Sequence, residues 1–157
     1  MKKLSYLFAT ALVGLGLLSG AALAEQAKQK VVYHINGDDP KQQSAAMGNI
    51  QNHINAVGAE NLDLRVVMHG DGLSLLLPPE AVGRTKMKAG NADPQMQAKI
   101  DNLRAQGVKF EVCANTLKGR QIDATNDLYM VEDEDIVPSG VAELAILQTQ
   151  GFTYIKP

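Results

Sequence analysis

The sequence predicts an α/β domain built around a mainly parallel β-sheet. Two observations lead to this fold class. First, β-rich segments alternate with segments of helical periodicity from residue 30 to the end of the chain. Second, the segment 30–36 (KVVYHIN) is apolar apart from polar breaks such as His34, which fits a central strand covered on both faces. Right-handed crossovers would then place helices on both sides of the sheet.

The first 24 residues have the features of a secretory signal peptide. Lys2 and Lys3 precede an apolar run over 4–18, and the segment 19–24 (SGAALA) ends in Ala-x-Ala. We expect cleavage after Ala24, which leaves a single domain over 25–157 in the periplasm or secreted, with no membrane segment. An uncleaved anchor is the alternative, but the apolar core is short for a membrane span.

Composition limits the remaining classes. Hydrophobic residues make up 45% and charged residues 20% of 157, which is typical of one globular domain and excludes disordered and polytopic membrane proteins. The net charge of −2 lacks the basic excess of a nucleic-acid binder. A single cysteine excludes an intramolecular disulfide.

The first helix is predicted directly after the first strand. Asp39 is placed to cap it, and Pro40 has the fixed φ that suits the first helical position. Apolar side chains recur at helical spacing as far as Val57, and Gly58 is a typical C-terminal stop. We therefore expect a helix over 40–57.

The second strand is predicted over 62–69 (LDLRVVMH) and is closed by the turn residues 70–72 (GDG). The apolar stretch 73–77 reads as a single helical turn before two prolines. Residues 80–92 are polar and aperiodic, so we expect a loop or a loosely ordered excursion there.

The second half repeats the pattern. Asp93 and Pro94 begin a helix that ends at Gly107, followed by a third strand over 108–113 (VKFEVC) and a short helix over 114–120.

The last part of the chain is predicted as shorter elements. Residues 127–131 form a helix or turn, and 135–137 is a short strand before a proline. Ser139 caps a final helix that runs to Gln150, and 152–155 forms a terminal strand.

Three predicted strand ends fall on one edge of this sheet, at 34–38, 68–72 and 112–116. Ligands of open parallel sheets bind at that edge. His34 lies within its strand, and we expect it to be packed or hydrogen-bonded rather than chemically active.

Cys113 ends the third strand and is the candidate catalytic residue. Its thiol is expected to lie near the amide groups of the following residues, at a helix N-terminus whose partial positive charge stabilises a thiolate. The thiolate is the nucleophile and the sulfur acceptor. Ala114, Asn115, Thr116 and His69 are the candidate substrate-binding residues. A buried cysteine that packs as a small hydrophobe is the alternative.

The segment 107–122 (GVKFEVCANTLKGRQI) resembles the cysteine segment of the DsrE/DsrF family, the YchN-like α/β proteins of sulfur metabolism. The tail 137–157 (VPSGVAELAILQTQGFTYIKP) resembles the end of exported single-domain members, and the opening KVVYHIN also fits. The resemblance covers nearly the whole mature chain. It implies a three-layer α/β/α fold with about five strands, and homo-oligomers such as trimers or hexamers.

The resemblance also implies a role for Cys113. In cytoplasmic members, a cysteine in this region carries a persulfide that is passed between proteins. Cys113 would then take sulfane sulfur from a small sulfur compound or a thiol protein, with partners that differ because this chain is exported. No metal, nucleotide or other cofactor is implied.

Other functions stay open. The protein could be a non-enzymatic oligomeric binding or assembly module in which Cys113 is structural. A zinc or copper site from Cys113, His69 and Asp71 has suitable ligand types but no close ligand spacing. Cys-His hydrolysis has no local signature. For His69 a histidine at the surface or in a turn is the favoured interpretation.

Overall fold

The computed structural model describes residues 27–157, so the predicted signal peptide lies outside the described residues. Five parallel strands form one sheet in the order β4-β3-β2-β1-β5. The strands are β1 (Gln29–Ile35), β2 (Leu62–Met68), β3 (Lys109–Cys113), β4 (Ile136–Val137) and β5 (Thr153–Ile155). The predicted α/β class with a parallel sheet of about five strands is confirmed.

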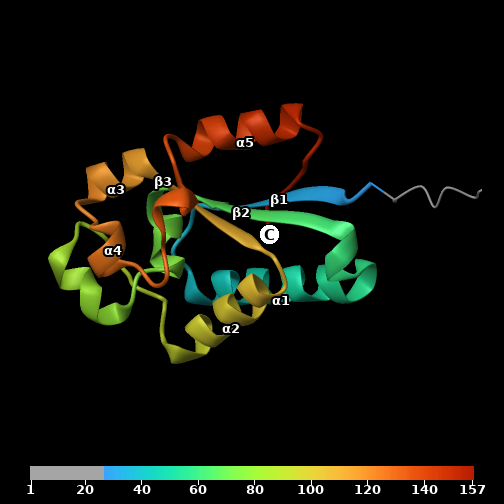
Figure 1. The fold of residues 1–157 in the computed structure, drawn as a ribbon. Helices are drawn as coiled ribbons and strands as arrows, with labels where there is room; N and C mark the ends of the chain where they lie inside the picture. The colour runs from blue at the N-terminus through green and yellow to red at the C-terminus, as the bar shows by residue number, and fades with distance from the viewer. Residues whose placement is uncertain (1–26) are drawn as a thin grey trace, which may run out of the picture.

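Helices cover both faces of the sheet and make three layers. Figure 1 shows α1 (Pro40–Val57) and α2 (Pro94–Ala105) on one face and α5 (Gly140–Thr149) on the other. The larger apolar core lies between the sheet and the first two helices. A smaller cluster lies under α5 and consists of Val32, Val67, Leu144, Leu147 and Phe152. Within residues 27–157, every helix is too short or too polar to cross a bilayer.

The predicted helix boundaries are set by the expected caps. The Asp39 carboxylate accepts hydrogen bonds from two first-turn amides, and that of Asp93 accepts one at 2.8 Å. Gly58, Gly107 and Gly151 follow the three longest helices with φ near +90°, a conformation that side chains with a Cβ rarely adopt. Each helix therefore ends where the chain turns back toward the sheet.

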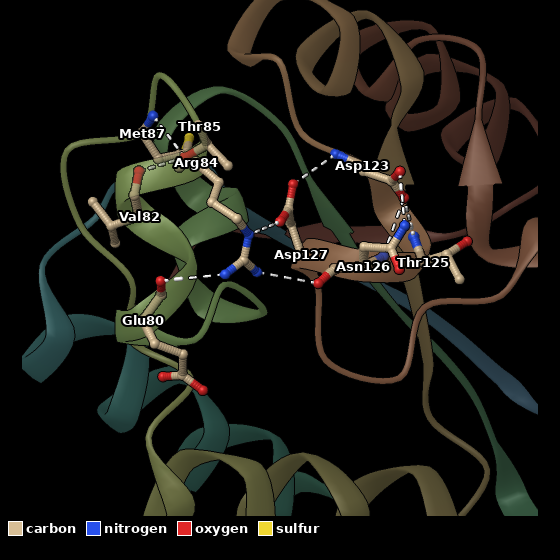
Figure 2. Close-up of polar contacts among 9 residues, drawn as sticks. All are labelled: Glu80, Val82, Arg84, Thr85, Met87, Asp123, Thr125, Asn126 and Asp127. Atoms are coloured by element: carbon tan, nitrogen blue, oxygen red, sulfur yellow. Dashed lines mark hydrogen bonds and ion pairs between the residues drawn. The ribbon is translucent and has the colours of Figure 1, made fainter.

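The excursion after β2 is more ordered than the sequence predicts. It contains two 3₁₀ helices, Gly70–Leu75 and Pro79–Arg84, so the expected loop over 80–92 is correct only in its second half. Figure 2 shows the reason: the Arg84 guanidinium donates to the Asp127 carboxylate at 2.8 Å, at the end of α4 (Ala124–Asp127). A partner 43 residues away leaves no local signal in the sequence.

Gly72 brings this excursion against the end of β1. A Cβ at that position would lie 2.1 Å from the carbonyl oxygen of Ile35, so only glycine permits the approach. The same approach places the residues that follow β2 beside those that end β1, on the edge of the sheet where the candidate site lies.

Candidate functional site

The candidate site lies on the α5 face of the sheet, at the carboxyl ends of the strands. Met68 pairs with Val112 in the parallel register, so the next residues in each chain segment, His69 and Cys113, are neighbours. Successive side chains of a strand alternate between faces. Because Val67 belongs to the cluster under α5, His69 two residues later projects on the same side.

The strands on the other side of β2 add two more residues to this face. His34 pairs with Val67 in the register of β1 and β2, and Tyr154 pairs with Val32 in that of β5 and β1. Val32 and Val67 both pack under α5, so their register partners His34 and Tyr154 share that face.

Cys113 is 4% exposed, and its thiol lies among hydrogen-bond donors. Burial raises the pKa of the thiol. Hydrogen bonds lower it by more, and they come from the amide of Gly140, the hydroxyl and amide of Thr116 and the amide of Asn115. The pKa of Cys113 therefore lies below its ordinary value. The Thr116 hydroxyl accepts a hydrogen bond from the Gly70 amide at 3.0 Å. That bond leaves the hydroxyl hydrogen free for the sulfur.

The predicted substrate-binding residues therefore surround the thiol in part. Asn115 and Thr116 act on it through their amides, and Ala114 is the half-buried first residue of α3 (Ala114–Arg120). Sequence reasoning missed Gly140, which approaches from the start of α5. A Cβ on Gly140 would lie 3.1 Å from that of His69 and 3.3 Å from that of Cys113, so Gly140 touches both residues.

A chain of hydrogen bonds leads away from His69. Its Nε2 lies 2.8 Å from the Nε2 of His34, and the Nδ1 of His34 lies 2.7 Å from the hydroxyl of Tyr154. The two imidazole centroids are 4.7 Å apart and the ring planes differ by 29°. The rings are therefore stacked with roughly parallel planes, and their Nε2 atoms lie within hydrogen-bond distance of each other.

Both histidines are neutral near pH 7. Burial, the neighbouring His69 and the Lys156 ammonium lower the pKa of His34 to about 4. Burial and Lys156 also lower the pKa of His69. An imidazolium is thus disfavoured at either position, and the contact between them joins a neutral donor to a neutral acceptor.

The expectation that His34 is hydrogen-bonded is confirmed, but the sequence did not predict its partners. Tyr154 lies 120 residues away in the chain, so no local pattern links the two. A usable signal was available in strand alternation. His34 and Val32 share a face of β1, and Val32 pairs with Tyr154 in the register of β1 with the terminal strand.

The structure does not assemble the alternative metal site. Asp71 is paired with Arg120 instead, with 2.5 Å between carboxylate and guanidinium. Among residues 27–157, no group of three or more histidine, cysteine or acidic side chains is arranged to hold a metal ion.

A small surface hollow opens beside His34, between the end of β1 and the first turns of α1. Its walls include His34, Asn36, Gln43 and Lys156 but not Cys113. The Lys156 ammonium donates to the Asn36 side chain at 2.9 Å. The hollow therefore borders the His34 end of the hydrogen-bonded chain rather than the thiol.

These features define a class of protein: a three-layer α/β domain in which a buried thiol with a lowered pKa lies at the carboxyl edge of a parallel sheet. The sequence matches the DsrE/DsrF-like family over residues 20–157, and the chain belongs to that family. The predicted family is confirmed.

Two solved structures share the fold. MTH1491 from Methanobacterium thermoautotrophicum, a protein of unknown function, is 28% identical, covers 83% of this chain and all of its own, and has a TM-score of 0.65. The ychN protein from E. coli is 23% identical and covers 82% of this chain and 99% of its own, with a TM-score of 0.55. No curated protein is significantly similar to the chain.

Proposed function

We propose that the protein accepts sulfane sulfur on Cys113 and holds it as a persulfide for delivery to a thiol. The observation that carries this proposal is the set of donors that lowers the pKa of Cys113, contributed by Asn115, Thr116 and Gly140. A thiolate is required for attack on sulfur, and the same donors would stabilise the negative charge of a bound persulfide. Membership of a family related to sulfur metabolism supports the choice of substrate.

The chemistry is a sulfur transfer without net oxidation. The Cys113 thiolate attacks the outer sulfur of a persulfide or polysulfide, and a new S–S bond forms as the old one breaks. The departing thiolate or shortened polysulfide takes the electron pair. An acceptor thiolate then attacks the outer sulfur of the Cys113 persulfide. The S–S bond to Cys113 breaks, and Cys113 takes the electron pair and returns to the thiolate form.

Transfer requires that a donor reach a thiol that is largely buried. Ala114, next to Cys113, is half-buried, and Asn115 is exposed, so the sulfur lies just beneath the surface. A small sulfur compound or the thiol of a partner protein would approach at this point.

We further propose that the transfer takes place in the periplasm or outside the cell, after cleavage behind Ala24. The protein would act there as a homo-oligomer, such as a trimer or hexamer. Exposed apolar residues on α5 support assembly: Val141 is 64% exposed and Ile146 is 47% exposed.

The test is to incubate the purified protein with sodium tetrasulfide and determine its intact mass. We expect an adduct of one sulfur atom that dithiothreitol removes. The matched control is Cys113→Ser, which keeps the size of the side chain and should show no adduct. A wild-type thiol that stays unmodified in the folded state would contradict the proposal.

A second candidate is an assembly module in which Cys113 only packs. The small exposure of Cys113 and the exposed apolar residues of α5 favour it. Both candidates predict an oligomer, so sulfur uptake by the wild type separates them, and light scattering of Cys113→Ala tests whether assembly needs the thiol. If the oligomer is the function, the variant keeps the molar mass of the wild type and wild type takes up no sulfur.

A further inference from the structure

We propose that Tyr154, His34 and His69 form a proton relay between solvent and the sulfur held at Cys113. This inference rests on the proposed function, because it assigns the proton that sulfur transfer needs. The relay is defined by its three side chains, which come from β5, from β1 and from the residue after β2. The sheet order places these segments side by side, with β3 and its cysteine next in line.

Both links of the relay have the geometry of hydrogen bonds. Tyr154 Oη to His34 Nδ1 is 2.7 Å, and His34 Nε2 to His69 Nε2 is 2.8 Å. Each ring nitrogen in these links lies within hydrogen-bond distance of its partner, and a neutral imidazole offers one N–H donor and one acceptor nitrogen to such links. A proton can therefore move along the chain without rotation of either ring.

The neutral state of both rings limits the relay to two arrangements. A neutral imidazole has one donor and one acceptor nitrogen. If Tyr154 donates to His34, then His34 donates to His69, whose remaining proton sits on Nδ1. If all the bonds reverse, His69 donates through Nε2 and its Nδ1 is an acceptor. The end of the relay at His69 thus changes between acid and base, and no imidazolium needs to persist.

The two ends of the relay lie in different environments. Tyr154 is 40% exposed, so its hydroxyl exchanges protons with water. His69 touches Gly140, which also touches Cys113. The structure shows no hydrogen bond between His69 and Cys113 within residues 27–157, so the incoming sulfur compound would have to bridge the two side chains.

The charged and titratable groups near the relay favour this use. Lys156 follows β5, and its ammonium opposes a second positive charge on either ring. Cys113 lies across Gly140 from His69, and its own pKa is lowered by donors other than the histidines. These donors favour the thiolate form of Cys113, while the relay stays neutral and holds a proton for the leaving group.

With tetrasulfide as donor, the step balances as follows. The Cys113 thiolate attacks a terminal sulfur, an S–S bond forms, and trisulfide leaves with the electron pair of the broken bond. Trisulfide takes the proton of His69 Nδ1. His69 Nε2 then takes the proton of His34 Nε2, His34 Nδ1 takes that of Tyr154, and water restores the tyrosine proton.

Two variants interrupt the relay and keep the fold. Tyr154→Phe removes the hydroxyl at the solvent end, and His34→Gln can still hydrogen-bond to His69 but cannot exchange protons between two nitrogens. The matched controls are Tyr129→Phe, which removes a hydroxyl bonded to Asp101, and His53→Gln. We expect both relay variants to load tetrasulfide sulfur about ten-fold more slowly, while the controls stay near the wild-type rate. The effect is smaller than the roughly 10²–10⁴-fold contribution of a complete general acid because His69 keeps its own proton in both variants.

Two further readouts separate proton transfer from a structural role. The solvent deuterium isotope effect on loading should be present in wild type and reduced in Tyr154→Phe. The imidazole tautomers, measured by nitrogen-15 NMR, should shift in the same variant. Unchanged loading rates and isotope effects in both relay variants, with wild type active, would overturn the relay alone. Wild type that fails to load would overturn the proposed function and the relay with it.

Discussion

Two pairs of polar side chains lie on the same face of the sheet under α5, and they differ in charge. Near the middle of the strands, Arg65 and Glu111 form an ion pair at 2.7 Å. At the carboxyl ends, His34 and His69 form a hydrogen-bonded pair that is neutral. Both pairs join neighbouring strands, so the difference arises from the residue types rather than from the fold.

The ion pair is held at a cost. One carboxylate oxygen of Glu111 and the Nε of Arg65 are buried without a hydrogen-bond partner. Burial raises the pKa of Glu111 even though Arg65 opposes that shift, whereas the pKa of Arg65 is itself raised, against the effect of burial, by Glu111. Arg65 remains 23% exposed, so water reaches part of the pair.

The comparison shows two ways of placing polar groups under one helix. The ion pair keeps both charges because each charge stabilises the other, and its guanidinium stays protonated. The histidine pair loses its charge instead, and a neutral pair can pass protons. Only the second kind of arrangement suits the sulfur transfer proposed for Cys113, and it lies next to that residue.

The largest expected effect comes from breaking the ion pair. In Glu111→Ala the Arg65 guanidinium loses its 2.7 Å partner and keeps only the Asp63 carboxylate at 3.7 Å, so we expect the free energy of unfolding to fall by about 3 kcal/mol. Urea denaturation measures this. The control is the double variant Arg65→Met with Glu111→Leu, which removes both charges and should be clearly more stable than the single variant. A single variant as stable as wild type would show that the pair is fully hydrated.

The second effect is a pH dependence of stability from the histidine pair. The pKa of His34 is about 4 in the folded state and about 6.5 when unfolded, so the unfolded state binds more protons between these values. This contribution is fully present above pH 6.5 and is lost as the pH falls toward 4. The full pKa difference corresponds to about 3 kcal/mol across that window. Because His34 borders a hollow that is open to solvent, we expect a smaller loss of about 2 kcal/mol, measured by urea denaturation at each pH.

The control for this window is His34→Gln, which has no titrating group at the position. The difference in slope between wild type and variant isolates His34 from the carboxylates that titrate at lower pH. His69 has the same sign, since its pKa is also lowered, and keeps a smaller slope in the variant. Equal slopes in the two proteins would show that His34 titrates normally.

Much of the fold could be predicted because its signals are local. Asp39 and Pro40 mark the start of α1, and Gly58 marks its end within the same short segment. The predicted position of Cys113 at a strand end is also confirmed. The β-rich segment of the sequence ends at Cys113, and so does β3. Parallel strands then bring such ends to one edge.

The rest of the site depends on contacts between distant segments. Tyr154 meets His34 across 120 residues, and Gly140 reaches the thiol from the start of α5. The spacing of residues within one segment carries no record of which segment will pack beside it. Strand alternation could have narrowed the search, because it assigns His34 and Val67 to one face once the register is known.

The smallest expected effect on stability comes from Gly140, the first residue of α5, which lies close to both His69 and Cys113. In Gly140→Ala the new methyl group would lie 3.1 Å from the Cβ of His69 and 3.3 Å from that of Cys113, so both must move by a few tenths of an ångström. We expect stability to change by no more than about 1 kcal/mol, because the shift is small and alanine is the better helix former. The reaction rate of Cys113 with iodoacetamide should nevertheless fall several-fold, since the displaced thiol loses alignment with its donors.

The matched control is Gly48→Ala in α1, whose Cβ would meet no atom within 4 Å. That variant should gain about 0.5–1 kcal/mol and keep the wild-type labelling rate. Equal labelling rates in the two glycine variants would show that the close approach of α5 does not tune the thiol.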